Sequence, residues 1–258
     1  MSTEPKILFH VEGQVGRITL NRPGKLNALD LEMLRQLESA VDDLESRTDV
    51  RAVLLDSAGG RAFCVGADIH AWTALAPLEM WSTWIRLGHR VFNRLATLRQ
   101  PLIALIQGFA FGGGLELALT ADIRIASEQA SFAMPEVKLA TVPGWAGTSR
   151  LSKIIGRPRA KQMIFSGATI DAGCAERWGL VNEVVPADIL QTRAAELIQL
   201  ISRNAPISVQ IAKQLVNTDS TDALVLESLA GALSASTTDA SEGLKSFQEK
   251  RPPEFRGK

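Results

Sequence analysis

The sequence predicts an α/β fold followed by a helical C-terminal module. Over residues 1–199, short β-branched and aliphatic segments alternate with segments whose apolar residues recur at helical spacing. Over residues 200–258 only the helical spacing remains, which indicates a separate helical module. With 258 residues, 46% of them hydrophobic, the chain is long enough to bury a large core without disulfides.

The first predicted elements are two strands with a helix between them. The strands cover Val15–Leu20 and Ala52–Asp56, and the helix covers Leu31–Ser46 with Asp30 as its N-cap. Apolar runs, periodicity and turn residues then predict a strand at Leu102–Ile106, a helix at Leu115–Thr120, strands at Asp122–Ala126 and Ser131–Ala133, and helices over about Ala146–Ile155, Ile189–Ser202, Pro206–Val216 and Asp222–Ser234.

The charge balance argues against nucleic acid or a membrane as a partner. Twenty-eight Lys and Arg residues offset 28 Asp and Glu residues, so the chain has no net field to attract either. The most apolar stretch, Leu102–Ala121, is long enough to span a bilayer but carries Glu116 well inside it. We therefore expect a buried strand and a buried helix there.

The cysteines and the N-terminal residues fit a protein of the reducing cytoplasm. Cys64 and Cys174 are far apart and form no C-x-x-C pair, which argues against a zinc site and a secreted disulfide scaffold. Met1–Phe9 lacks the apolar core of a signal peptide. The histidines form no metal-ligand pattern, so we expect no metal site and read them as surface or packing residues: His10, His70 and His89.

Two segments share a design that offers backbone N–H groups to an anion. In Val65–Ile69 and in Phe111–Glu116, an apolar run leads into tiny residues at an expected helix start. The first N–H groups of a helix lack intrahelical partners, and tiny residues let a ligand approach them closely. Two such donors that converge form an oxyanion hole. Taken alone, Gly112–Gly114 fits tight packing of a helix on a sheet equally well, and it matches no nucleotide-binding motif.

Two glutamates are candidates for proton transfer. Glu116 lies in an apolar segment, where an unpaired carboxylate is costly unless it is hydrogen-bonded or used in chemistry. Glu136 follows Pro135 and begins another largely apolar stretch. Two carboxyl groups on one cavity suit acid/base chemistry, because burial and mutual repulsion raise their pKa values. From these residues alone, one glutamate in a salt bridge and the other on a loop surface is the simpler interpretation.

Four ordered segments resemble the enoyl-CoA hydratase/isomerase (crotonase) family. They are Leu20-Asn21-Arg22-Pro23 with Leu26-Asn27-Ala28-Leu29, Phe63-Cys64-Val65-Gly66-Ala67-Asp68-Ile69, Gly108–Ala118 with its glycine triplet, and Met134-Pro135-Glu136. Each is weak by itself, whereas the ordered set is specific. Thr141–Gly144 and Gly179–Val185 extend the resemblance over nearly the whole chain.

The resemblance implies a crotonase-like spiral of β-β-α turns with a C-terminal helical trimerisation module, assembled as a trimer or a dimer of trimers. It also implies that the N–H groups of Ala67 and Gly113 hold a thioester oxygen. The residues implied to bind the acyl-CoA substrate are Leu26, Ala28, Gly66, Asp68, Ile69, Phe111, Gly112, Pro143 and Gly144.

The activity implied by the resemblance is reversible addition of water to a trans-2-enoyl-CoA. Glu116 would deprotonate the water that adds to C3, and Glu136 would deliver the proton to C2. No metal or redox cofactor is implied, since coenzyme A is part of the substrate. A Δ3,Δ2-enoyl-CoA isomerase or another crotonase-type lyase or hydrolase is the alternative, and a noncatalytic RNA-binding or scaffold member is a more distant one.

Tryptophans leave the preferred acyl group open. Trp145 stands where many hydratases have a small residue, and it either narrows the acyl pocket or packs outward. The other tryptophans of the N-terminal half are expected to pack or to form a pocket wall: Trp72, Trp81 and Trp84.

Overall fold

The protein is built on two sheets, seen in a computed structural model that describes residues 4–218 and 223–258. The six-stranded sheet has the order β1 (Ile7–Glu12), β2 (Val15–Leu20), β3 (Ala52–Ser57), β5 (Leu102–Ile106), β7 (Ile123–Ser127) and β10 (Glu183–Val185). The four-stranded sheet has the order β4 (Ala62–Cys64), β6 (Phe109–Phe111), β8 (Ser131–Ala133) and β9 (Ile170–Asp171).

Successive turns of the chain stack on one another. Each of the pairs β3–β4, β5–β6 and β7–β8 gives one strand to each sheet, and helices follow before the next turn. Equivalent strands pair in parallel, β3 with β5 and β5 with β7 in one sheet, β4 with β6 and β6 with β8 in the other. The predicted α/β class and the spiral of β-β-α turns are both confirmed.

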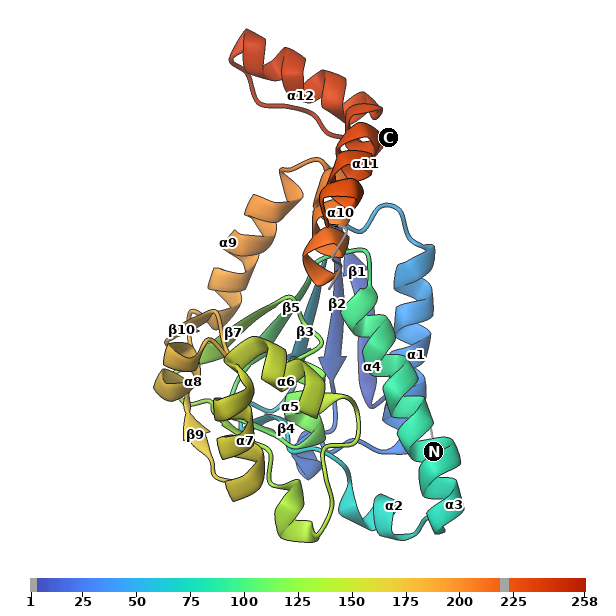
Figure 1. Ribbon diagram of the computed structural model, residues 1–258, viewed down its shortest axis with the longest axis vertical. Coiled ribbons are helices and arrows are strands. Elements are labelled where there is room, and N and C mark those ends of the chain that lie inside the picture. Colours follow the sequence, from blue (N-terminus) through green and yellow to red (C-terminus); the bar gives the residue numbers. More distant parts are fainter. Residues whose placement is uncertain (1–3, 219–222) are drawn as a thin grey trace.

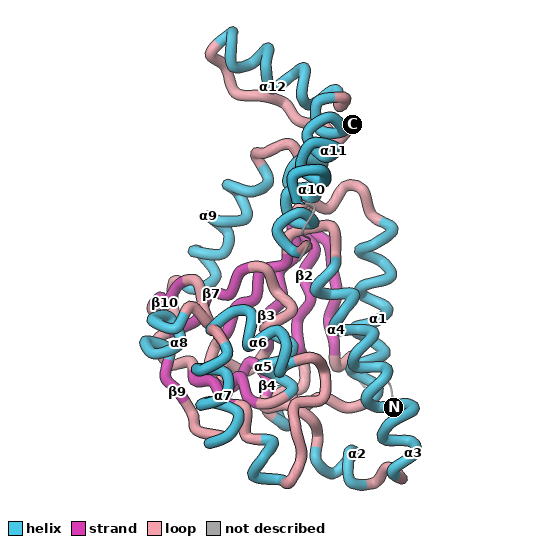
Figure 2. Tube along the Cα trace, viewed as in Figure 1, coloured by secondary structure: helices cyan, strands magenta, loops and turns pink. Residues whose placement is uncertain are grey.

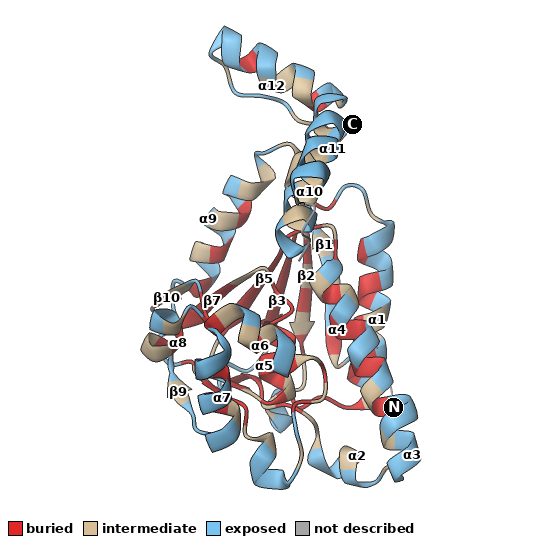
Figure 3. Ribbon diagram, in the orientation of Figure 1, coloured by how far each residue is buried: buried red, intermediate tan, exposed pale blue. Residues whose placement is uncertain are grey.

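Helices cover both faces of the six-stranded sheet. α1 (Leu31–Ser46) and α4 (Arg86–Thr97) pack together on one face, and α9 (Leu190–Ser202) packs on the other (Figure 1). Val53 of β3 faces the α1 and α4 side, whereas Leu54 faces α9. Strand β5 is therefore apolar throughout and β3 is apolar over its first four residues, because both of their faces are buried (Figure 3).

Helix α1 forms with the predicted bounds. The Asp30 carboxylate accepts a hydrogen bond from the Met33 N–H at 2.9 Å, which satisfies a donor that the first turn leaves open. Its inward side then buries residues at spacings of three and four: Met33, Leu34, Leu37, Ala40, Val41 and Leu44.

The remaining helical elements between Pro23 and Trp178 are short. They are a 3₁₀ turn at Pro23–Lys25, α2 (Ile69–Thr73), α3 (Pro77–Glu79), a π-helical turn at Met80–Ile85, α5 (Gly113–Ala118), a 3₁₀ turn at Glu136–Leu139, α6 (Gly147–Ile155), α7 (Arg157–Ser166) and α8 (Ala172–Trp178). Two expected helix starts are corrected. α5 begins at Gly113 and not at Leu115, and Ala67 precedes α2, which is capped by Asp68.

The C-terminal helices project away from the sheets. They are α10 (Pro206–Asn217), α11 (Ala223–Ala235) and α12 (Thr238–Glu249) (Figures 1 and 2). Lys213 of α10 pairs with Asp122 at 2.7 Å and so ties the first of them to the body. The predicted start of α11, Asp222, lies outside the described residues. The predicted module boundary near residue 200 falls in the last turn of α9, and the division into two domains stays a prediction.

None of the helices within residues 4–218 and 223–258 is both long enough and apolar enough to cross a membrane. The apolar stretch Leu102–Ala121 instead supplies β5, β6 and the buried helix α5.

Gly114 offers a test of how tightly the turns stack. A Cβ added there would lie 2.0 Å from the Cys64 carbonyl oxygen of β4, a backbone atom with no room to move. We expect Gly114→Ala to lower the free energy of unfolding by about 2–3 kcal/mol in urea titrations. Gly24→Ala, which would meet nothing within 4 Å, should change it by less than ~0.5 kcal/mol. Equal effects of the two substitutions would contradict this picture.

Candidate active site

Ala67 presents a backbone N–H that the fold leaves free. The Leu29 N–H donates to the Gly66 carbonyl at 2.7 Å, and the Asp68 N–H donates to the Leu29 carbonyl at 2.7 Å. The Gly66 carbonyl and the Ala67 N–H belong to one trans peptide, so they point in opposite directions. The Ala67 N–H therefore points away from Leu29, and it has no partner among the described residues.

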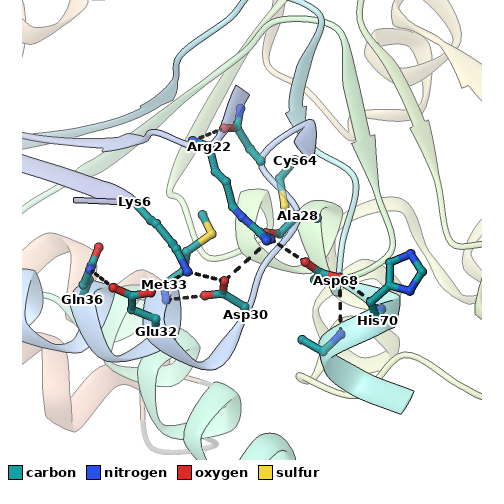
Figure 4. Close-up of polar contacts among 12 residues, drawn as sticks. Lys6, Arg22, Ala28, Asp30, Glu32, Met33, Gln36, Cys64, Asp68 and His70 are labelled. Atoms are coloured by element: carbon teal, nitrogen blue, oxygen red, sulfur yellow. Dashed lines mark hydrogen bonds and ion pairs between the residues drawn. The ribbon is translucent and has the colours of Figure 1, made fainter. Parts of the chain in front are cut away.

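An ion pair fixes the loop that carries this donor. The Arg22 guanidinium donates to the Asp68 carboxylate at 2.7 Å and to the Ala28 carbonyl at 2.9 Å (Figure 4). Asp68 also accepts from the backbone N–H groups of His70 and Ala71 and so caps α2. Burial raises the pKa of Asp68, but Arg22 and these N–H groups outweigh it and hold the pKa below its ordinary value. Asp68 thus positions the loop.

Gly113 supplies the second free donor. Gly112, at φ 52°, donates its N–H to the Ala133 carbonyl at 2.9 Å, and α5 begins at the next residue. The Gly113 N–H is in the first turn of α5 and has no partner in the described part of the chain. A Cβ at Gly66 would lie 3.2 Å from this nitrogen, so the absence of a side chain at Gly66 lets the two donor loops approach each other.

Glu116 is buried, with 2% of its surface exposed, on the inner side of α5. One carboxylate oxygen accepts hydrogen bonds from the N–H groups of Trp145 and Gly147, both at 2.7 Å. The other makes only a 3.4 Å contact with the Gly144 N–H. Burial raises the pKa of Glu116, and these N–H groups together with the charge of Arg150 partly offset the increase.

Glu136 has no such partners. It begins the 3₁₀ turn after β8, and both of its carboxylate oxygens are buried without a hydrogen-bond partner among the described residues. A Cβ at Gly112 would lie 3.1 Å from one of these oxygens, so the glycine makes room for the carboxyl group. Burial, with a further contribution from the charge of Glu116, raises the pKa of Glu136 to about 7.

One cavity of about 250 Å³ joins these groups. Both glutamates line it together with Ala67 and Gly113, and the rest of its wall is largely apolar: Val65, Ile69, Trp72, Met80, Trp84, Ile85, Leu139, Val142 and Trp145, among others. No group of His, Cys, Asp and Glu able to hold a metal ion occurs within residues 4–218 and 223–258. The arrangement pairs two hydrogen-bond donors for a developing oxyanion with two carboxyl groups that differ in their surroundings.

A larger open hollow lies beside α9, and among the described residues that line it only one, Glu12, carries a carboxyl group. It is bordered by β1, β2 and α9 and measures about 690 Å³. Its charged Arg17 is already bound to Asp56 and to the Gln191 side chain. We therefore place the chemistry at the smaller cavity.

The predicted site residues divide into two sets. Those that line the cavity are Gly66, Ala67, Ile69, Gly112, Gly113, Glu116, Glu136 and Gly144. Those that lie outside its wall are Leu26, Ala28, Asp68, Phe111 and Pro143. The simpler interpretation, one glutamate in a salt bridge and the other on a loop surface, is wrong, because neither carboxylate forms a salt bridge with a described residue and both are buried.

Two arginines near the site had no assigned role in the sequence. Arg22 was noted only as part of the Leu20–Pro23 segment. The one unusual feature of Arg150 is its place in the first turn of α6, where the helix dipole disfavours a cation. Arg150 donates to the Trp145 carbonyl at 2.9 Å and so holds the loop that binds Glu116. The wall residues Leu139 and Val142 were missed as well, since only tertiary contacts bring them to the cavity.

Comparison with known proteins shows similarity over the whole chain. The family model described as enoyl-CoA hydratase/isomerase matches residues 10–258. A short-chain-enoyl-CoA hydratase of Clostridium acetobutylicum is 41% identical over 249 residues, 95% of each chain. A putative enoyl-CoA hydratase/isomerase of Bacillus subtilis is 42% identical over 97% of this chain and 98% of that one. The crystal structure of an enoyl-CoA hydratase from Bacillus anthracis superposes with a TM-score of 0.94, at 36% identity, over 98% of this chain and 100% of that chain.

The raised pKa of Glu136 predicts how stability depends on pH. The folded protein holds this proton more tightly than the unfolded chain does, so stability falls as pH rises from the ordinary value of 4.5 towards about 7. Glu136→Gln removes this pH-dependent loss of stability. At pH 8 we therefore expect the melting temperature of the variant to exceed that of the wild-type protein, by ~2–4 °C for each kcal/mol that the buried charge costs. At pH 5 the difference should nearly vanish.

Calorimetric scans at the two pH values measure this effect. Glu128→Gln, at an exposed glutamate, is the control and should show no such pH-dependent gain. A Glu136→Gln variant that is less stable than wild type at pH 8 would argue against a costly buried carboxylate.

Proposed function

We infer that this chain, which belongs to the enoyl-CoA hydratase/isomerase family, is an enoyl-CoA hydratase that adds water reversibly across the C2–C3 double bond of a trans-2-enoyl-CoA thioester. The observation that carries the proposal is the pair of buried carboxyl groups on one cavity with two free N–H groups. The relatives named above point to the same reaction.

In the proposed mechanism, the N–H groups of Ala67 and Gly113 bind the thioester oxygen. They stabilise the enolate that forms when oxygen adds at C3, because preorganised donors in a water-poor site need no reorganisation. Both groups are free of other partners within the described residues, and a close contact between their loops at Gly66 supports a shared target.

Glu116 is proposed as the base. Its carboxylate is held by backbone N–H groups on one oxygen, while the second oxygen makes only a long contact and keeps room for a water. This carboxylate takes one proton from the water whose oxygen bonds to C3.

Glu136 is proposed as the acid that protonates C2. A pKa of about 7 leaves a large fraction of this carboxyl group protonated at neutral pH, as a proton donor requires. Glu116 lies close enough for its charge to contribute to the raised pKa of Glu136. These steps move only water and protons, so they require no redox or metal cofactor, and coenzyme A enters as part of the substrate.

We also propose that residues 26–29 border the path of coenzyme A. This segment lies beside the donor loop, because the Val65 N–H donates to the Leu26 carbonyl at 3.3 Å and Leu29 pairs with Ala67. Leu26 and Ala28 are the side chains concerned.

The cytoplasm remains the expected location, consistent with Cys64 and Cys174 both being free thiols.

Replacement of each glutamate tests the division of roles. We expect Glu116→Gln and Glu136→Gln each to lower the rate of crotonyl-CoA hydration by roughly 10²–10⁴-fold while the Kd for a saturated acyl-CoA changes little, because each group acts on a different proton. The absorbance of the conjugated thioester follows hydration, and calorimetry follows binding. Wild-type rates in both variants would remove the glutamates from the mechanism.

The same variants separate hydration from isomerisation. An isomerase shifts a double bond with one carboxyl group, so one substitution would abolish migration of a 3-enoyl-CoA double bond and the other would be nearly silent. We expect both substitutions to impair hydration. Product analysis of the wild-type protein with both substrates completes the comparison.

We further propose a homo-oligomer, a trimer or a dimer of trimers, assembled through α10–α12. These projecting helices expose large apolar side chains that a single chain leaves in water: Val216, Leu224, Val225, Leu229, Leu233, Leu244 and Phe247. Burial of such side chains between copies would stabilise the assembly.

Light scattering tests the assembly. We expect the mass of a trimer or hexamer for the wild-type chain, and dissociation for the Leu229→Glu/Leu233→Glu double variant, since two buried charges would face an apolar interface. Phe165→Glu, at an exposed residue of α7, should keep the wild-type mass. A monodisperse wild-type monomer would contradict the proposal.

A further inference from the structure

The indole of Trp145 fills the space between α4 and the start of α5. It is 3% exposed and meets a glycine at each of two opposite edges. A Cβ at Gly88 would lie 2.1 Å from the indole nitrogen, and a Cβ at Gly113 would lie 2.7 Å from Cζ3 on the far side of the ring. The absence of both side chains is therefore what lets the indole lie here.

Aromatic neighbours and the backbone hold the ring in this position. The Trp84 and Phe92 rings lie 5.3 Å and 4.9 Å from it, centroid to centroid. The backbone N–H of Trp145 donates a hydrogen bond to the Glu116 carboxylate, and the backbone carbonyl of Trp145 accepts one from Arg150. These two bonds restrict movement of the residue out of the cavity wall. The indole N–H itself has no hydrogen-bond partner in the described part of the chain, so shape and not hydrogen bonding fixes the ring.

The ring also closes part of the catalytic cavity. Trp145 and Trp84 belong to the same cavity wall as Glu116 and Glu136, and Trp145 lies directly behind Gly113, the proposed donor to the thioester oxygen. An acyl chain bound at the thioester would extend past the two glutamates into the part of this cavity that Trp84 and Trp145 line. At about 250 Å³ the cavity is below the ~300–1,000 Å³ typical of pockets for larger ligands.

We propose that Trp145, seated against Gly88, closes the acyl end of the cavity and restricts the substrate to short acyl groups. Gly88 is the second determinant, because any side chain at this position would displace the indole. The inference rests on the proposed hydratase function and adds to it the substrate class and the residue pair that sets it.

A panel of trans-2-enoyl-CoA thioesters measures the acyl limit. We expect the wild-type kcat/KM for crotonyl-CoA to exceed that for 2-octenoyl-CoA by at least ~10-fold, since a closed apolar pocket discriminates by that factor or more for each added methylene. Trp145→Ala should raise the ratio of octenoyl to crotonyl kcat/KM by roughly 10-fold or more. Trp145→Leu, which keeps more of the packing, should give an intermediate shift and serves where the alanine variant does not fold.

A double variant with a large side chain at position 88 and a small one at position 145 tests the role of Gly88. Adding Gly88→Leu to Trp145→Ala refills the vacated space from α4, and we expect the octenoyl to crotonyl ratio to return to within ~3-fold of wild type. Trp178→Ala removes a tryptophan that contacts Arg159 away from the cavity, and the ratio should stay unchanged. This control separates a specific effect from general loosening of the fold.

Two results would overturn the proposal. One is a wild-type enzyme that hydrates octenoyl-CoA as well as crotonyl-CoA, and the other is an unchanged ratio in both Trp145 variants. If the wild-type protein hydrates no thioester at all, the proposed function fails instead. The acyl limit is then measured from the Kd values of butyryl-CoA and octanoyl-CoA, and equal affinities for these two ligands would contradict it.

Discussion

Burial of the Glu116 carboxylate is the constraint on which the structure of the candidate active site depends. A carboxyl group with 2% exposure is costly in an apolar interior unless hydrogen bonds replace water. The N–H groups of Trp145 and Gly147 provide those bonds, and the Gly147 N–H is the first donor of α6, which the helix itself leaves without a partner. Arg150 holds the same loop from the other side and places a positive charge near the carboxylate.

A second constraint is the close stacking of successive turns, which brings the two free donors together. Each donor belongs to a different turn, Ala67 after β4 and Gly113 after β6, and the parallel pairing of these strands sets the distance between them. Side chains would keep the turns apart. A Cβ at Gly114 would lie 2.0 Å from the Cys64 carbonyl oxygen, and Gly66 combines a φ of 96° with backbone atoms of the neighbouring turn 3.0 and 3.2 Å from a Cβ, so glycine at both positions serves the packing and the site together.

Local signals explain which parts of the fold the sequence predicted. The bounds of α1 follow from one cap residue and a regular apolar face, and strands buried on both sides read as continuous apolar runs. β1 and α12 were missed, since an edge strand with exposed residues and a largely polar helix give weak apolar patterns. Ala67 was expected in the first turn of a helix, but the Asp68 cap moves that start two residues along.

The sequence predicted the two glutamates and the two donor loops that line the cavity, but not the hydrogen bonds and burial that distinguish the two carboxyl groups. Glu116 and Glu136 follow from the ordered motifs, but the contrast between them depends on contacts made after folding. The Glu116 carboxylate accepts hydrogen bonds from the N–H groups of a distant loop, whereas the Glu136 oxygens accept none from any other described residue, and this contrast is not encoded near these residues in the sequence. The direction of the Trp145 side chain was left open for the same reason, because Gly88 lies far away along the chain.

Position 145 divides two tasks between its backbone and its side chain. The N–H that binds Glu116 is present in every amino acid except proline, whereas the indole that bounds the cavity is particular to tryptophan. Mutation can therefore alter the shape of the cavity without removing the hydrogen bond to the carboxylate. Under the proposed role of Trp145, a single codon therefore offers protein engineers a change of acyl preference that leaves the hydrogen bond to Glu116 in place.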